Sequence, residues 1–106
     1  MNTNGKGIKW ESLKGKKAKG AKGVVFSILL PHANHVSVAG DFNSWDTEAQ
    51  VMKKDQAGVW KLSVNLTPGS YQYRFFVDGV WQNDPESVES VPNPFGTLNN
   101  VKRVKY

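Results

Sequence analysis

The sequence of 106 residues contains no cysteine and only two histidines, His32 and His35. The absence of cysteine excludes disulfides, thiol catalysis and thiolate-bound zinc. The two histidines lie three residues apart in a predicted loop, without the further ligands that a metal site needs. The sequence also lacks a phosphate-cradling glycine loop and any other cofactor motif. We therefore expect no metal site and no cofactor.

Long hydrophobic runs are also missing from this sequence. The first apolar run, VVFSILL at residues 24–30, ends at Pro31 and is far shorter than the about 20 residues of a membrane-spanning helix. The lysine-rich stretch before it is too long for the basic start of a secretory signal. We therefore expect no membrane association and a cytoplasmic location.

The net charge of +5 is unevenly distributed along the chain. Residues 1–22 hold seven lysines and one glutamate, whereas residues 23–106 hold seven basic and eight acidic residues. The stretch KGKKAKGAKG is too polar to fold alone, so the composition predicts a flexible lysine-rich arm at 1–22 and one folded domain at 23–106. The arm is either a solvated leader or a weak binder of polyanions such as nucleic acid. The nearly neutral domain itself is not expected to bind nucleic acid.

Short runs that alternate between apolar and polar residues follow one another from residue 23 onward, and no stretch has a helical period. Regular spacing of such runs, with Gly, Pro, Asn and Asp between them, is typical of an antiparallel sandwich. We expect an all-β, immunoglobulin-like fold. The expected strands cover residues 24–30, 35–39, 59–66, 71–77, 80–82 and 100–105, with a short additional strand at 50–53.

Asp78-Gly79 is a strong hairpin signal, because a two-residue type I′ turn needs positive φ at both positions. This turn fixes which residues of the two strands lie opposite each other. The expected pairs are Val77 with Val80, Phe76 with Trp81, Phe75 with Gln82 and Arg74 with Asn83. The apolar face of this hairpin, expected to face the core, consists of Tyr71, Tyr73, Phe75, Val77 and Val80.

The same register places Arg74, Phe76 and Trp81 together on the outer face of the sandwich. A second lone tryptophan, Trp45, follows in the polar loop GDFNSWD, in which Phe42 is expected to fill the core. Exposed indole rings beside amide and cationic groups suit a sugar, whose C–H face stacks on the ring while its hydroxyls take hydrogen bonds. Two structural alternatives remain open. In the first, Phe76 and Trp81 are covered by the arm or by a loop. In the second, Trp45 serves only to cap one end of the sandwich.

Three segments, VSVAGDFNSWD, GVWKLSVNLTPGSYQYRFFVDGVWQNDP and FGTLNNV, resemble in order and spacing the family-48 carbohydrate-binding modules. These include the glycogen-binding domain of the AMP-activated protein kinase β subunit and the early-set domains of isoamylases and branching enzymes. The resemblance covers about residues 24–104. It implies an early-set immunoglobulin-like sandwich that binds α-1,4-linked glucan, with Trp45 and Trp81 as the two stacking residues.

The resemblance also assigns four further residues to the carbohydrate site. Arg74 stands where the kinase subunit has a sugar-contacting lysine, and its planar fork of donors presents hydrogen bonds differently. Asn99 matches an asparagine that binds glucose hydroxyls, and Thr97 lies in the same loop. Phe95 stands where the kinase subunit has a leucine, so that a ring able to stack replaces a side chain that packs.

An enzymatic function is not expected, and we assign no catalytic residue. Glycoside hydrolysis needs two carboxyl groups across a bound sugar, and the acidic cluster of Asp84, Glu86 and Glu89 has no group opposite it. The chain is also too short for the catalytic barrel of such enzymes. We expect a non-catalytic module for glycogen, starch or maltooligosaccharide, with a glycogen-metabolising enzyme or regulatory protein as a further partner. The alternative is a protein-interaction module on the same fold with little affinity for sugar.

Overall fold

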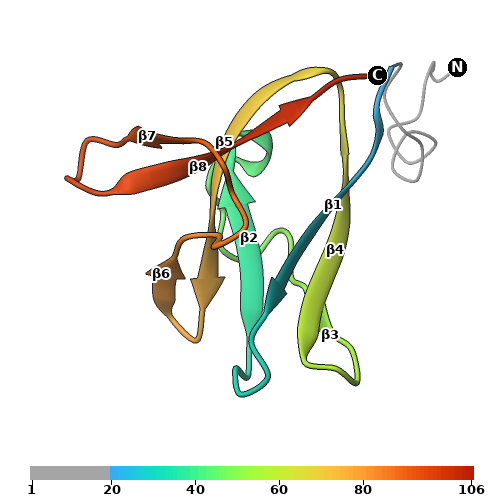
Figure 1. Ribbon diagram of the computed structural model, residues 1–106, viewed down its shortest axis with the longest axis vertical. Helices are drawn as coiled ribbons and strands as arrows, with labels where there is room; N and C mark the ends of the chain where they lie inside the picture. Colours follow the sequence, from blue (N-terminus) through green and yellow to red (C-terminus); the bar gives the residue numbers. More distant parts are fainter. Residues whose placement is uncertain (1–19) are drawn as a thin grey trace, which may run out of the picture.

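Two antiparallel β-sheets, packed face to face, make up the part of the chain that the computed structural model describes, residues 20–106 (Figure 1). One sheet has three strands in the order β1-β4-β3, and the other has five, with β6 paired to β5 beside the path β2-β5-β8-β7. The fold is the expected all-β, immunoglobulin-like sandwich. The strands are β1 Lys22–Leu29, β2 Val36–Gly40, β3 Lys53–Lys54, β4 Val59–Leu66, β5 Gly69–Val77, β6 Val80–Gln82, β7 Ser90–Pro92 and β8 Leu98–Val104, with a 3₁₀ turn η1 at Asp41–Asn43.

The lysine-rich arm expected at residues 1–22 lies, up to residue 19, outside the described residues. The chain enters the sandwich early, because Ala21 is buried and β1 begins at Lys22. Over residues 20–106, no helix is long and apolar enough to cross a membrane. Within that same range, no three His, Asp or Glu side chains lie close enough together to hold a metal ion.

The core lies between the two sheets, where alternate residues of each strand point inward. Phe26 of β1 meets Tyr73 of β5 edge to face, with ring centroids 5.0 Å apart and an interplanar angle of 72°. Phe42 of η1 packs against the core with its ring 5.3 Å from that of Phe26, as expected. The buried core residues are Phe26, Ile28, Ala33, Val36, Val38, Met52, Trp60, Val64, Leu66, Tyr73, Phe75 and Val104.

The expected inward face of the Asp78-Gly79 hairpin is correct for β5 and wrong for β6. Tyr73 and Phe75 are fully buried, and Tyr71 and Val77 are partly buried against the core. Val80 is 66% exposed instead. The three-residue strand β6 pairs only with the end of β5, so Val80 lies at the margin of the sheet and does not join the core.

Two further differences concern short edge strands. The strand expected at 50–53 appears as a single bridge between Val51 and Ser37, with β3 starting at Lys53. Strand β7 was not expected, and it contains Pro92, which cannot donate a backbone hydrogen bond. An edge strand tolerates proline, since one side of it has no partner strand, and β7 pairs only with β8.

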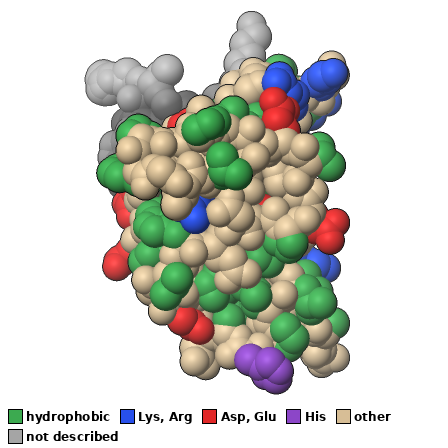
Figure 2. All heavy atoms as spheres, turned by 60° about the vertical axis from the view of Figure 1, so that its left-hand side comes forward, with side chains coloured by type: hydrophobic (Ala, Val, Ile, Leu, Met, Phe, Trp, Pro, Cys, Tyr) green, Lys and Arg blue, Asp and Glu red, His purple; other side chains and the backbone are tan. Residues whose placement is uncertain are grey.

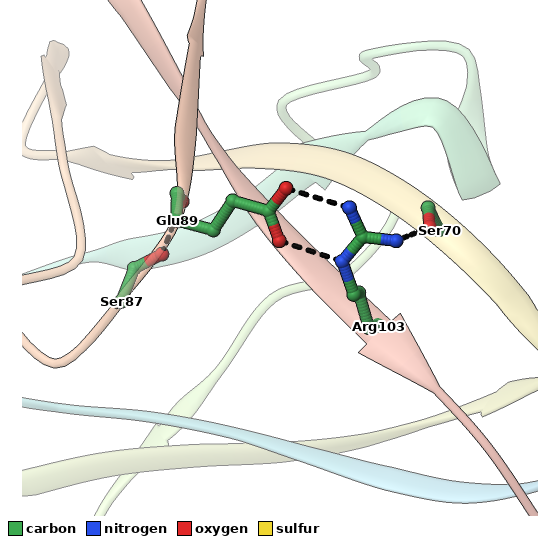
Figure 3. Close-up of polar contacts among 4 residues, drawn as sticks. All are labelled: Ser70, Ser87, Glu89 and Arg103. Carbon is green, nitrogen blue, oxygen red and sulfur yellow. Dashed lines mark hydrogen bonds and ion pairs between the residues drawn. The ribbon is translucent and has the colours of Figure 1, made fainter.

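An exposed ion pair joins β8 to the segment that precedes β7 (Figure 3). Arg103 donates from Nε and Nη2 to the two carboxylate oxygens of Glu89, at 2.7 Å each, and from Nη1 to Ser70 Oγ at 3.2 Å. The Arg103 guanidinium holds the pKa of Glu89 below its usual value. Since the Val101 amide also donates to the Glu89 carbonyl oxygen at 2.9 Å, this segment is tied to β8 just before the turn that follows β7.

Candidate functional site

The turn at Asp78-Gly79 is the expected type I′ turn. Asp78 has φ 47° and Gly79 has φ 85°, and the ladder pairs Val77 with Val80, Phe76 with Trp81 and Phe75 with Gln82. The Asp78 carboxylate also accepts hydrogen bonds from the backbone amides of Asn34 and His35, at 3.0 and 2.8 Å. The hairpin is thereby fixed against the loop that precedes β2, and its register is rigid.

This register groups three side chains on the outer face of the five-stranded sheet. The ring centroids of Phe76 and Trp81 lie 4.9 Å apart, and the Arg74 guanidinium lies 5.8 Å from the Trp81 ring centroid. Such a distance permits a cation–π contact. Trp81 is 38% exposed. Arg74 and Phe76 thus pack against an indole ring that stays partly open to solvent.

The loop that carries Trp45 begins at Gly40, at the end of β2. A side chain at Gly40 would collide with the Gln72 carbonyl oxygen and lie 2.9 Å from the Tyr73 Cβ atom. Asn43 then fixes the loop, because its Oδ1 accepts from the Gly40 amide at 3.0 Å and its Nδ2 donates to the Val38 carbonyl oxygen at 3.0 Å. The bare backbone of Gly40 is what allows the chain to turn here against β5.

Trp45 is held in a turn in which the backbone at Ser44 and Trp45 is left-handed, with φ of 57° and 60°. The Trp45 amide donates to the Gly40 carbonyl oxygen at 3.0 Å, and Nε1 donates to Asp41 Oδ1 at 3.3 Å. Its half-buried ring lies 6.1 Å from the Trp81 ring at 65°. Trp45 therefore packs beside Trp81 on the outer face, and the two indoles form an angled surface.

The turn after β7 provides the third aromatic side chain of this region. The Asn93 amide donates to the Thr97 carbonyl oxygen at 2.9 Å, and Gly96, with φ 83°, closes the turn. Phe95 is 89% exposed near the tip. The turn thus presents a phenylalanine ring to solvent.

Polar groups line the sheet between these aromatic side chains. Arg74 donates from Nη1 to Thr97 Oγ1 at 3.3 Å and from Nη2 to Asn83 Oδ1 at 3.0 Å, so the pair expected opposite each other does meet through its side chains. The Arg74 Nε atom is buried and has no hydrogen-bond partner within residues 20–106. Asn99 is 8% exposed and donates from Nδ2 to Gln72 Oε1 at 3.0 Å.

These groups surround one open groove with a volume of about 670 Å³. Figure 2 shows this side of the molecule, where hydrophobic side chains gather around a hollow. Among the described residues that line the groove, Arg74 alone is charged. The lining residues are Trp45, Arg74, Val80, Trp81, Asn93, Pro94, Phe95, Thr97 and Asn99.

The groove brings together all six residues expected to form the binding site, and adds Val80, Asn93 and Pro94. Asn93 was missed, although the Asn-Pro pair in VPNPFG is a turn signal. The side chain of Asn93 forms hydrogen bonds with Phe95, Thr97 and Asn99. A residue that organises its neighbours leaves little trace in the sequence, because its role depends on contacts across the turn.

The acidic cluster has structural partners on a different part of the surface. Tyr73 donates to Asp84 Oδ2 at 2.6 Å, and Glu89 forms the ion pair with Arg103. Burial, and then the hydrogen bond to Asp84, raises the pKa of the Tyr73 hydroxyl well above its usual value. Asp84 thus anchors the loop after β6 to the core, and none of the described residues that line the groove carries a carboxyl group.

Comparison with known proteins identifies relatives of this domain. A family described as the glycogen recognition site of AMP-activated protein kinase matches residues 28–106. Protein PTST homolog 2, chloroplastic, from Arabidopsis thaliana is 45% identical over 60 residues, which cover 56% of this chain and 11% of that protein. Human 5′-AMP-activated protein kinase subunit beta-2 is 41% identical over 70 residues, covering 66% and 25% respectively.

The 1,4-alpha-glucan branching enzyme GlgB of Nostoc sp. is 36% identical over 80 residues, which cover 71% of this chain and 10% of the enzyme. The chain therefore matches about a tenth to a quarter of the length of these relatives. The family match includes every residue that lines the groove. The chain belongs to the glycogen-recognition domains of the family-48 carbohydrate-binding modules.

Proposed function

We propose that this domain binds α-1,4-linked glucan, as glycogen, starch or maltooligosaccharide, in the groove between Trp45, Trp81 and Phe95, without catalysing a reaction. The observation that carries the proposal is the pairing of two indole rings, 6.1 Å apart, with a polar wall in one open groove. A pyranose needs both surfaces, because its C–H face stacks on an aromatic ring and its hydroxyls require hydrogen bonds. The single charge among the lining residues suits an uncharged ligand.

The groove residues take different parts in this proposal. Trp45 and Trp81, set at 65° to each other, stack on successive glucose units of a curved chain. Arg74, Thr97 and Asn99 form hydrogen bonds to the sugar oxygens. Phe95, exposed on the turn after β7, closes over the outer side of the glucan.

The affinity of one groove for a short glucan should be modest. Two stacking contacts and a few hydrogen bonds, less the cost of ordering the ligand, give a net binding free energy of about 4–7 kcal/mol, or roughly millimolar to 10 µM. When several linked domains bind one polysaccharide, the apparent affinity should be higher than that of a single groove.

Isothermal titration of the full chain with maltoheptaose tests the proposal, with tryptophan fluorescence as a second signal. We expect measurable heat, a changed emission spectrum and protection of the fluorescence from a soluble quencher. A matched titration with cellohexaose, a β-1,4-linked glucan of straighter shape, should give much weaker binding. Absence of both heat and fluorescence change with maltoheptaose would refute the proposal.

A protein partner is a second candidate function, favoured by exposed apolar side chains away from the groove. Val25 and Leu29, which are 59% and 61% exposed, lie on the outer face of β1 in the three-stranded sheet. We propose that this face docks on a glycogen-metabolising enzyme or regulatory protein, as relatives of this domain occur within such longer proteins. Substitution V25D should then weaken the docking to a purified partner without changing maltoheptaose binding. Competition of the docking by maltoheptaose would argue against a separate face.

A further inference from the structure

The Asn93 side chain makes four hydrogen bonds and has only one possible orientation. Its Oδ1 accepts from the backbone amides of Phe95 at 3.0 Å and Thr97 at 3.2 Å. Its Nδ2 donates to Thr97 Oγ1 at 2.7 Å and to Asn99 Oδ1 at 3.0 Å. Backbone N–H groups can only donate, so the atom that faces them must be the oxygen. The amide nitrogen of Asn93 therefore always faces Thr97 and Asn99.

The Thr97 hydroxyl receives two hydrogen bonds from groups that cannot accept one. The first comes from Asn93 Nδ2 and the second from Arg74 Nη1, at 3.3 Å. These two donors occupy both lone pairs of the hydroxyl oxygen, and its own proton must point elsewhere. Because Thr97 is exposed and lines the groove, this proton is available to a ligand there.

The orientation of Asn93 also determines that of Asn99. Since Asn93 Nδ2 donates, the atom of Asn99 that faces it is Oδ1, and the Asn99 Nδ2 atom is turned toward Gln72 Oε1 at 3.0 Å. One of the two Nδ2 protons of Asn99 is used in this contact, and the second is left for a ligand in the groove. Asn99 is only 8% exposed, so little water is present to compensate for a reversed amide.

We infer that Asn93 is a positioning residue that sets the hydrogen-bond polarity of the groove, so that Thr97 and Asn99 present protons to the ligand. Sugar oxygens that act as acceptors, whether they belong to a hydroxyl, a glycosidic bond or the ring, are the partners that such a wall requires. The inference rests on the proposed glucan binding. It goes further because it names a residue, Asn93, whose hydrogen bonds orient the side chains of Thr97 and Asn99.

The substitution N93D separates polarity from the shape of the turn. An aspartate keeps an oxygen that accepts from the amides of Phe95 and Thr97, and replaces the donating nitrogen with a second acceptor. The Thr97 proton is then drawn toward residue 93 and away from the groove, and the Asn99 amide reverses. Maltoheptaose is uncharged, so the added carboxylate does not repel it.

We expect N93D to weaken maltoheptaose binding by about tenfold or more in titration calorimetry, with an unfolding midpoint close to that of the wild type. The substitution T97V removes the hydroxyl on which Asn93 acts. In the T97V background, N93D should therefore cost clearly less affinity than in the wild type, because the two changes affect one interaction. Equal losses in both backgrounds would contradict the inference, as would wild-type affinity of N93D.

Nuclear magnetic resonance of the ligand-free chain supplies a test that does not need sugar. Backbone amide shifts of Phe95 and Thr97 should be retained in N93D, while the side-chain amide signals of Asn99 and Gln72 should move. Displacement of the Phe95 and Thr97 signals to unstructured positions would overturn the inference in favour of a purely structural role. Failure of the wild type to bind maltoheptaose would instead refute the proposed function, and the Asn99 and Gln72 signals would still decide the polarity.

Discussion

The two faces of β5 carry aromatic or long side chains in alternation, and they use them in opposite ways. On the inner face, Tyr73 and Phe75 are 1% and 0% exposed, enclosed by the three-stranded sheet. On the outer face, Arg74 and Phe76 lie only partly buried beneath Trp81, which is 38% exposed. The inner side chains are positioned by close packing, and the outer ones by turns and hydrogen bonds. Stability and binding should therefore respond to different substitutions along a single strand.

The largest expected effect comes from breaking the inner face. Truncation of Phe75 in F75A removes a fully buried ring and leaves a cavity, which should cost about 3–5 kcal/mol of unfolding free energy. Urea denaturation followed by circular dichroism measures this cost. The protein that remains folded should bind maltoheptaose nearly as the wild type does. A selective loss of affinity in that folded fraction would show that the two faces are coupled.

The next largest effect concerns Gly40, where the end of β2 passes close to the backbone of β5 and the Trp45 loop begins. In G40A the added methyl group collides with the backbone of Gln72 and with Tyr73 Cβ, at a cost of about 1–3 kcal/mol. Thermal unfolding should show this loss, and titration should show weaker maltoheptaose binding because the Trp45 loop starts here. G23A is the matched control, since its methyl group meets only the end of the Ser63 side chain and should change the unfolding midpoint little.

Removal of the outer indole should have the opposite effect to F75A, with a loss of affinity and little loss of stability. We expect W81A to lower maltoheptaose affinity by about tenfold or more, or about 1.4 kcal/mol, because a stacking surface is lost. Its unfolding free energy should stay within about 1 kcal/mol of the wild type, since the ring is partly exposed. Calorimetric titration and urea denaturation of the same sample measure both values. A W81A protein that unfolds as readily as F75A would contradict the division between the faces.

The smallest effect concerns the ion pair of Glu89 with Arg103, which belongs to neither face of β5. Because the folded pKa of Glu89 is lowered from 4.5, its contribution to stability is complete above that pH and is lost as the pH falls through the lower folded pKa. The unfolding midpoint of the wild type should therefore fall more between pH 6 and pH 3 than that of E89Q. Both groups are exposed, so the difference should be small. Parallel pH profiles of the two proteins would exclude this contribution.

The sequence allowed most of β5 and β6 to be predicted because the turn at Asp78-Gly79 imposes a register. Parity then follows for every residue on both strands, and the placement of Trp81 beside Phe76 is confirmed. The exposure of Val80 was not predictable from parity, because β6 is short and pairs only with the end of β5. Strand β7 was missed for a similar reason, since its pairing depends on the neighbouring strand β8 rather than on its own composition.

The meeting of Trp45 with Trp81 depended on information that periodicity does not contain. A lone tryptophan in a polar loop fits a ligand platform and a cap on the sandwich equally well. What brings the Trp45 ring beside that of Trp81 is the backbone path after Gly40, with two consecutive left-handed residues. The resemblance to family-48 modules supplied the grouping of Trp45, Trp81 and Asn99 before the geometry was known. It did not indicate Asn93, whose contacts lie within one turn of this chain.

The hydroxyl of Tyr106 accepts a hydrogen bond from the Lys22 amide at 3.1 Å and donates to the carbonyl oxygen of Leu66. The two ends of the sandwich are thereby fastened together, and Figure 1 shows them on the side of the molecule away from β6 and β7. Lys22, where β1 begins, and Tyr106 therefore lie at one pole of the described domain. A label attached at either of these two residues would therefore leave the opposite side of the domain, with β6 and Trp81, unobstructed (Figure 1).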